Sequence, residues 1–260
     1  MTVTKAICSF HFLALLATPS FAQTADSIWD EERLSDATVC LLQPVSDSTR
    51  KVGSGTIMRN GTSYFLLTAT HVAMTTTNAT LLVLRLDGDT PRMVDLTRVV
   101  DGGVLNWLHH AVADISLIRL APKDSDVKDR VAKVAFPFSQ VYYRHDLPGR
   151  DVDLTFLGYS VIDLNVKHFS PLVFSAHRSS GLLTQPRADT HTPCDFFFLD
   201  VPGIGGCSGS GVFSSVEKKV YVGCGATRME GIVHGTMSDI TGGKMAVVTP
   251  APYIADFFRK

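Results

Sequence analysis

Three polar residues in this sequence have the types and surroundings that nucleophilic chemistry requires. Ser208 lies between Gly206 and Gly209, after an apolar run and a glycine turn, and this setting presents a hydroxyl beside backbone N–H groups. His71 closes one apolar segment, and Asp114 opens an alternating one. A serine hydroxyl is a poor nucleophile near neutral pH, so it needs a base within hydrogen-bond reach and a third group that orients the base. Histidine is the side chain whose ordinary pKa lies closest to neutral pH, so His71 would be the base and Asp114 would orient it.

The order histidine, aspartate, serine and the local segments T-A-T-H, D-I-S-L-I-R-L and G-C-S-G-S resemble the trypsin-like serine protease superfamily. The spacing is similar to that of its bacterial glutamyl-endopeptidase and Htr-type branches, and the resemblance covers most of the chain after about residue 35. It implies a secreted serine endopeptidase that cleaves peptide bonds through an acyl-enzyme. His71, Asp114 and Ser208 would be the triad, and the N–H groups of Gly206 and Ser208 would form the oxyanion hole.

Short apolar or alternating runs separated by turn residues continue from residue 37 onward, which predicts an all-β protein. The strands are expected over 37–42, 55–58, 63–68, 80–86, 114–120, 152–157, 196–201, 211–213 and 219–223. Asn60-Gly61 predicts a hairpin with a type I′ turn. Apolar residues at helical spacing predict a closing helix within 251–260, and the polar segments 124–128 and 179–191 are expected to be surface loops.

The family resemblance also implies how these elements are organised. We expect two antiparallel six-stranded β-barrels, with the active site in the cleft between them. The N-terminal barrel, residues 23–135, would carry His71 and Asp114. The C-terminal barrel, residues 136–260, would carry Ser208 and end in the short helix.

The N-terminal 22 residues have the pattern of a cleaved secretory signal peptide. Lys5 precedes an apolar stretch, and small residues occupy the cleavage positions up to Ala22. A membrane anchor is the alternative, but the apolar run is shorter than the roughly 20 residues that a span requires. We therefore expect a secreted or periplasmic protein that does not stay inserted in a membrane after signal cleavage.

Cysteine content and charge narrow the chemistry further. Removal of the signal leaves Cys40, Cys194, Cys207 and Cys224, so an oxidising compartment predicts at least one disulfide, with the pairing left open. There is no C-x-x-C pair, and neither a metal nor a cofactor is expected. The net charge of −1 argues against nucleic acid as a partner. Cys207, beside the nucleophile, is expected to be disulfide-bonded or inert, with a redox switch as the alternative.

The sequence indicates no substrate side-chain preference. The resemblance places Pro202 at the base of the substrate pocket, Ala226 near the triad aspartate and Arg228 at the pocket rim, and these are weak candidates for substrate binding. Cys207 and Gly211 depart from the usual residues around the serine. These departures support an alternative function, a catalytically inactive protease-fold protein that binds peptides. An esterase of the α/β-hydrolase type is disfavoured, because the order of the three residues differs.

Overall fold

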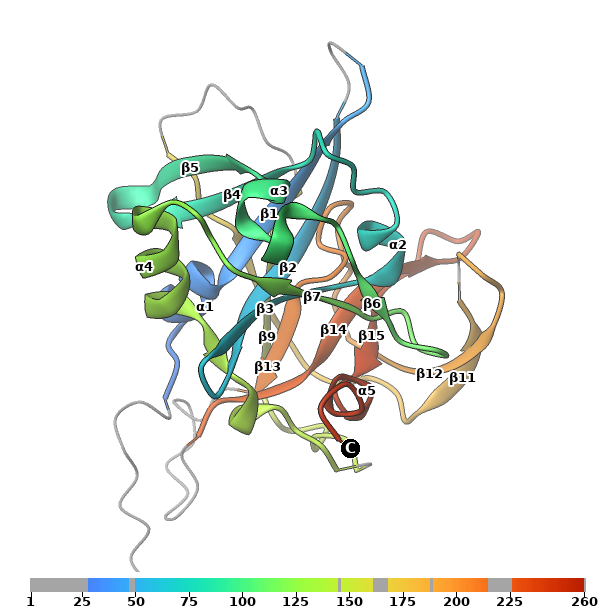
Figure 1. Ribbon diagram of the computed structural model, residues 1–260. Coiled ribbons are helices and arrows are strands. Elements are labelled where there is room, and N and C mark those ends of the chain that lie inside the picture. The colour runs from blue at the N-terminus through green and yellow to red at the C-terminus, as the bar shows by residue number, and fades with distance from the viewer. Residues whose placement is uncertain are drawn as a thin grey trace, which may run out of the picture.

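The computed structural model describes residues 28–46, 50–144, 146–160, 168–187, 189–214 and 226–259, and two β-sheets form the body of the protein (Figure 1). The strands of the first sheet are β1 (Thr38–Pro44), β2 (Arg50–Asn60), β3 (Ser63–Thr68), β4 (Leu81–Leu86), β5 (Thr90–Asp95), β6 (Leu108–His109), β7 (Ser116–Leu120) and β8 (Phe136–Pro137). They run in the order β5-β4-β1-β2-β3-β7-β6, and β8 adds a short parallel pairing to β2.

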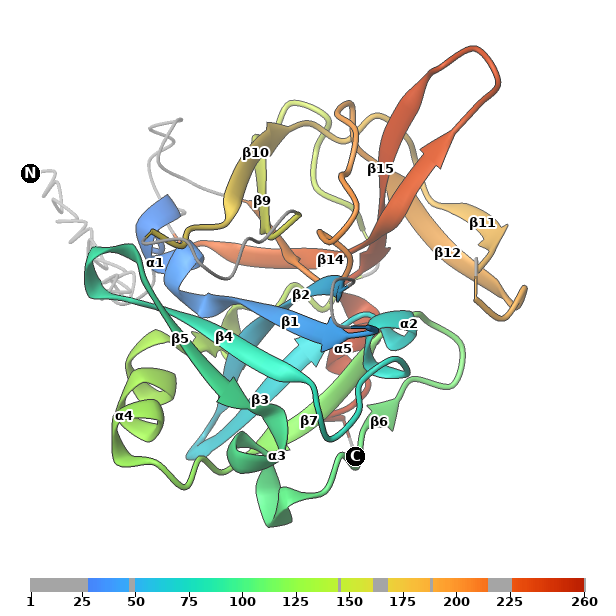
Figure 2. The same cartoon turned by 90° about the horizontal axis from the view of Figure 1, so that it is seen from above.

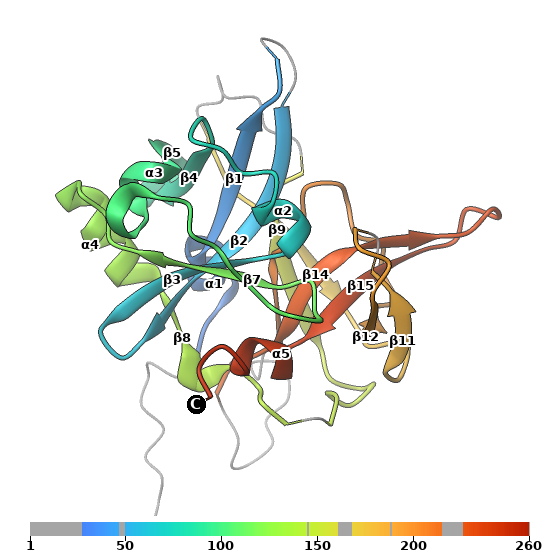
Figure 3. The ribbon, with the colours of Figure 1, turned by 45° about the vertical axis from the view of Figure 1, so that its right-hand side comes forward.

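The second sheet is built entirely from the C-terminal part of the chain. Its strands are β9 (Leu154–Gly158), β10 (Leu172–Ala176), β11 (Leu183–Pro186), β12 (Pro193–Phe198), β13 (Gly211–Ser214), β14 (Arg228–Ser238) and β15 (Lys244–Pro250). Their order is β10-β9-β13-β14-β15-β12-β11, and every pairing is antiparallel. The outer part of the β14–β15 hairpin projects as an arm beyond the body of the protein (Figures 2 and 3).

The predicted all-β class is confirmed, but the strand number and the closure of the sheets differ from expectation. The sheets have eight and seven strands in the described part of the chain, and neither closes into a six-stranded barrel. Closure requires the two edge strands of a sheet to pair with each other. Here β5 and β6 are the edges of the first sheet and β10 and β11 are those of the second, so both ladders stay open.

The helices are short and lie at the margins of the sheets. They are α1 (Glu31–Ala37), α2 (Thr70–Ala73), α3 (Leu96–Val99), α4 (Ser125–Val134) and α5 (Pro252–Ala255), with single 3₁₀ turns at Asp87–Asp89, Asp101–Gly103 and Phe138–Gln140. None of the helices within the described ranges has the length and apolar character that a membrane crossing requires.

Helix α4 corrects the prediction of a surface loop over 124–128. Val127, Val131 and Val134 recur at helical spacing and are buried, so this segment covers the core with an apolar face. Arg130 is buried as well and pairs with Asp36. The predicted loop 179–191 similarly contains β11, which pairs with β12. The closing helix is present as the single turn α5.

The hairpin predicted at Asn60-Gly61 is confirmed, but its turn is different. Asn60 pairs with Ser63, so the two loop residues are Gly61 and Thr62. Only Gly61 has a positive φ, of 58°, whereas a type I′ turn needs positive φ at both central positions. The turn is therefore not type I′.

Two sets of expectations lie outside the described residues. They are the signal peptide over 1–22 and the strand over 219–223, together with Cys224. The proposed division at residue 135 stays a prediction, although the strands of the first sheet end at Pro137 and those of the second begin at Leu154.

Candidate active site

Two adjacent strands bring His71 and Asp114 together. β3 pairs with β7 so that Thr68 lies opposite Ser116. His71 comes shortly after Thr68, and Asp114 comes shortly before Ser116, so both lie at the same end of this strand pair. The Nδ1 atom of His71 lies 2.7 Å from Oδ2 of Asp114, and the backbone N–H of His71 donates to Oδ1 at 3.0 Å. The Asp114 side chain is fully buried, and that of His71 is 32 % exposed. The carboxylate therefore fixes both the backbone and the ring of the histidine, which leaves Nε2 for chemistry.

The carboxylate of Asp114 has two further partners. Nδ1 of His234 lies 2.5 Å from Oδ2, and a guanidinium nitrogen of Arg187 lies 3.5 Å from Oδ1. Burial by itself would raise the pKa of Asp114, but the hydrogen bonds from His234 and His71 outweigh it and hold that pKa well below its usual range. Asp114 is therefore ionised at neutral pH, as the stabiliser of a histidine cation must be.

His234 reaches Asp114 because of an irregularity in β14. In the pairing with β15, Val233 lies opposite Val248 and Gly235 lies opposite Val247, so His234 is the extra residue of a bulge. A bulge changes the direction in which a side chain points. The His234 ring packs on Phe196 at 4.8 Å and meets the His71 ring edge-on at 5.6 Å (Figure 3 shows α2 beside β14).

Sequence reasoning missed His234 and placed Ala226 at the position near the triad aspartate. His234 stands directly after the segment from Met229 to Val233, which is buried and part of β14. Recognising that strand would have marked the histidine at its end as a candidate. The signal was weak because Glu230 and Gly231 interrupt the apolar residues of this segment, and both residue types are depleted in strands.

The turn that carries Ser208 is held against the first sheet by one residue of β2, Ser54. The backbone N–H of Ser54 donates to the carbonyl of Ser208 at 2.9 Å, and its hydroxyl donates to the carbonyl of Gly206 at 2.8 Å. The same hydroxyl accepts the N–H of Tyr159 at 2.9 Å. Ser54 is completely buried, so these bonds join the two sheets directly beneath the serine. No local sequence pattern identified this role.

Gly206 and Ser208 have backbone N–H groups available for a substrate. Within the described part of the chain, neither group donates a hydrogen bond, although the N–H groups of Cys207, Gly209 and Ser210 all do. Gly206 has φ of 97°, and a Cβ there would come within 2.3 Å of the carbonyl oxygen of Tyr159, so only glycine fits. Two free donors next to a serine are what an oxyanion hole consists of.

Ser208 and His71 line the same groove, which has a volume of about 530 Å³. The hydroxyl of Ser208 donates to the carbonyl of His234 at 3.0 Å. Attack on a substrate requires the hydroxyl to leave this carbonyl and face His71 instead, which is a change of rotamer about the Cα–Cβ bond. The structure thus brings His71 and Asp114 into direct contact and places Ser208 across a shared groove.

The residues suggested for specificity lie elsewhere. Pro202 is exposed after β12, and neither it nor Ala226 or Arg228 lines the groove that Ser208 and His71 share. Ala226 and Arg228 border other hollows, and the Arg228 guanidinium lies over the ring of Tyr142 at 5.5 Å.

His71, Asp114 and His234 also form a set of donors of the kind that zinc accepts, with their ligand atoms within 4.8 Å of one another. However, both Nδ1 atoms lie at hydrogen-bond distance from one carboxylate oxygen, and the Arg187 guanidinium approaches the other. The carboxylate is therefore already surrounded by donors, which favours a hydrogen-bonded cluster over a metal site.

The cysteines correct the expectation of a disulfide in the described part of the chain. Cys40, Cys194 and Cys207 are buried and unpaired, and Cys224 is not among the described residues. Burial raises the pKa of the Cys207 thiol, so the reactive thiolate is disfavoured. This environment supports an inert thiol beside Ser208 rather than a redox switch.

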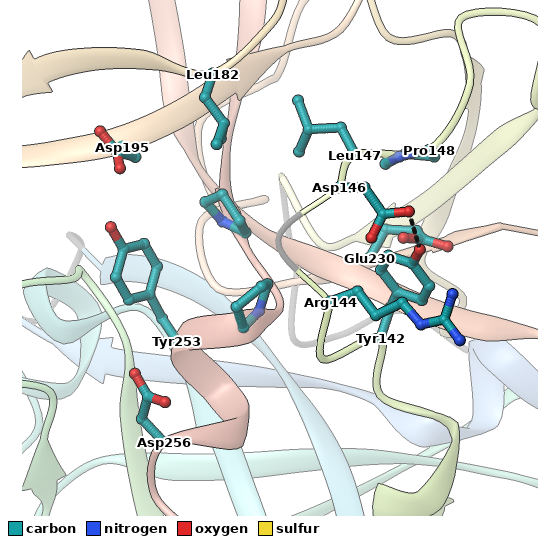
Figure 4. A pocket seen from close by; sticks show the side chains of 12 residues that line it. Tyr142, Arg144, Asp146, Leu147, Pro148, Leu182, Asp195, Glu230, Tyr253 and Asp256 are labelled. Carbon is teal, nitrogen blue, oxygen red and sulfur yellow. Dashed lines mark hydrogen bonds between the residues drawn. The ribbon is translucent and has the colours of Figure 1, made fainter.

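A second cavity, of about 150 Å³, lies between the segment 142–148 and the start of α5 (Figure 4). Glu230 of β14 forms part of its wall. One carboxylate oxygen of Glu230 accepts the Ser214 hydroxyl at 2.6 Å, and the other has no hydrogen-bond partner among the described residues. Nearby, the Tyr142 hydroxyl donates to Asp146 at 2.8 Å. Burial raises the pKa of Glu230 to about 7.

Glu230 should therefore make stability depend on pH. The folded protein keeps a proton on Glu230 between its ordinary pKa of 4.5 and about 7, whereas the unfolded chain has released it, so the free energy of unfolding falls as pH rises through this window. Glu230→Gln should remove this dependence and be more stable than wild type at pH 8 by about 3 kcal/mol. Urea denaturation at pH 5 and pH 8 measures this difference. Glu31→Gln, at an exposed glutamate, should retain the wild-type dependence.

Comparison with known proteins finds similar structures but no similar sequences. No protein-family model matches the sequence, and no curated protein matches it significantly. The structure resembles the Rv3671c protease of M. tuberculosis in its active form, with a TM-score of 0.54 and 15% identity over 86% of this chain and 80% of that chain. It also resembles a mutant of the same protein in an inactive form, with a TM-score of 0.52 and 15% identity over 85% and 84%. The fold is that of the chymotrypsin-like serine proteases. At this identity, the likeness establishes the fold and leaves activity to be argued from the site.

Proposed function

We propose that this chain is a serine endopeptidase. One arrangement carries the proposal: His71, hydrogen-bonded to the buried Asp114, lies across a single groove from a serine whose turn offers two unused N–H donors. The fold is one that hosts this chemistry, and the order of the three residues along the chain resembles that of trypsin-like proteases.

Each group has a definite task in the proposed reaction. Nε2 of His71 takes the proton of Ser208 as its oxygen attacks the carbonyl carbon, and Asp114 stabilises the imidazolium that results. The N–H groups of Gly206 and Ser208 bind the developing oxyanion. His71 then gives the proton to the leaving amine, and water releases the acyl group by the reverse sequence of proton transfers.

His234 and Arg187 support this reaction through Asp114. The Nδ1–H of His234 donates to Oδ2 of Asp114, the oxygen that also accepts the hydrogen bond from His71. The Arg187 side chain also donates to the carbonyls of Val112 and Ala113 at 3.0 Å. These contacts fix both the backbone of the loop before β7 and the carboxylate of Asp114 at its end. We assign His234 and Arg187 as positioning residues.

Secretion and the family branch complete the proposal. The support for secretion is the signal-like pattern over 1–22, and the support for the glutamyl-endopeptidase and Htr-type branch is the motif spacing. Both rest on the sequence alone.

Labelling with a fluorophosphonate probe tests the proposal directly, because the probe reacts only with an activated serine. Wild type should be labelled, and Ser208→Ala and His71→Ala should lose labelling completely. Ser160 is a matched control, since it lines the same groove, so Ser160→Ala should be labelled as wild type is. Mass spectrometry should locate the adduct on Ser208. A folded wild type that stays unlabelled would reject the proposal.

That rejecting outcome would favour the second candidate, a peptide-binding protein without turnover. The observation in its favour is the hydrogen bond from the Ser208 hydroxyl to the His234 carbonyl, which holds the hydroxyl away from the base. Binding of peptides with no cleavage during long incubation would establish it.

A further inference from the structure

The groove beside His71 and Ser208 is cationic in the part of its wall that the structure describes. It is lined from both sheets, and among the described lining residues the titratable ones are Arg50, Lys51 and His71, with no carboxylate. Arg50 and Lys51 are exposed at the start of β2, and neither forms an ion pair with any described residue. Since the whole chain has a net charge of only −1, this is a local concentration of positive charge.

The positions of Arg50 and Lys51 relative to Ser208 follow from the course of β2. Ser54 of β2 is hydrogen-bonded to the carbonyl of Ser208 at 2.9 Å. Lys51 lies three residues earlier on the same strand, and a strand advances about 3.3 Å per residue, so the Lys51 backbone stands about 10 Å along β2 from Ser54, the residue that contacts the serine turn. Arg50 is one residue farther away. An extended peptide in the groove would cover this distance with about three residues.

The direction of the peptide follows from the chemistry of proton transfer. His71 must touch the leaving amine to protonate it, so the segment after the scissile bond leaves along the wall that His71 forms. Val72, Thr75 and Thr76 line the groove together with His71. β2 lies beside this segment, since a Cβ on Gly53, two residues after Lys51, would come within 2.4 Å of Val72. The acyl segment lies on the other side of Ser208, where the serine hydroxyl meets β14 at His234.

From this placement, and on the basis of the proposed peptidase function, we infer that Arg50 and Lys51 select substrates with acidic residues at the second to fourth positions after the scissile bond. Two exposed cations at the end of a groove attract carboxylates and repel basic side chains, which sorts substrates by charge. The attraction is screened by salt, because both side chains are exposed to solvent.

The first test is sequencing of cleavage products from a peptide library derived from a digested proteome. Asp and Glu should be enriched at the second to fourth positions after the cut, and a matched acidic peptide should exceed its Asn/Gln counterpart in kcat/KM by about five- to tenfold at low salt. Arg50→Glu with Lys51→Glu should reverse the preference while labelling of Ser208 by the fluorophosphonate probe is unchanged. Arg59→Glu is the control, since Arg59 is exposed on the same strand but outside the groove.

A binding measurement separates this inference from the proposed function. Fluorescence anisotropy with the Ser208→Ala variant compares acidic and neutral peptides without any need for turnover. Preferential binding of acidic peptides that the double charge reversal abolishes supports the inference, even if wild type cleaves nothing and the peptidase proposal fails. Equal binding and equal cleavage of acidic and neutral peptides by a probe-reactive wild type would overturn the inference and leave the peptidase proposal intact.

Discussion

Asp114→Asn should lower kcat by about 10⁴-fold while leaving KM and the fold nearly unchanged. An amide in place of the carboxylate offers an N–H where His71 and His234 need an acceptor, and it carries no charge to stabilise the imidazolium. Steady-state kinetics on a peptide substrate measure the loss, and circular dichroism checks the fold.

The expected loss of kcat includes a change in the tautomer of His71. A second measurement distinguishes this change of tautomer from the loss of the carboxylate charge alone. NMR of the imidazole protons should show the Nδ1–H resonance of His71 in wild type and its loss in Asp114→Asn. Asp124→Asn is a matched control, since Asp124 forms an ion pair with Arg98 at 2.7 Å on the surface. A variant at Asp114 that retains more than a tenth of wild-type kcat would contradict the proposed role.

Gly209→Ala should be among the most destabilising single substitutions in the protein, with an expected loss of at least about 4 kcal/mol. Gly209 has φ of 89°, and a Cβ there would lie 2.3 Å from the Ser54 carbonyl oxygen and 2.9 Å from the Ala69 backbone nitrogen. Backbone atoms cannot move aside as a flexible side chain can, so the turn that carries Ser208 would have to separate from the first sheet.

Gly242→Ala isolates the contribution of the clash. Gly242 has a similar φ of 90°, but no atom lies within 4 Å of the added Cβ, so only the cost of the left-handed conformation remains, about 1–2 kcal/mol. Denaturant unfolding of both variants measures the difference. Similar stabilities for the two would show that the Ser208 turn is not packed against Ser54 as described.

Much of the fold was accessible from local sequence patterns. The strands β1, β3, β7, β9 and β13 were predicted close to their observed positions, because short runs rich in apolar residues and bounded by turn residues are typical of strands. The helix α4 was missed, although its valines recur at helical spacing, because its polar first turn suggested a loop. The open edges of the two sheets could not be read from the sequence, since closure depends on how distant strands pair.

The sequence by itself determined the fold class and the three residues for which a reaction can be argued, His71, Asp114 and Ser208. Each stands at the end of a strand or in a glycine turn, and such features leave a local signature. Only the tertiary structure decided what surrounds them: the second histidine on Asp114, the link from Ser54 to the serine turn, and the cations along the groove. These contacts join residues more than 100 positions apart or depend on a bulge, and neither produces a periodic pattern along the chain.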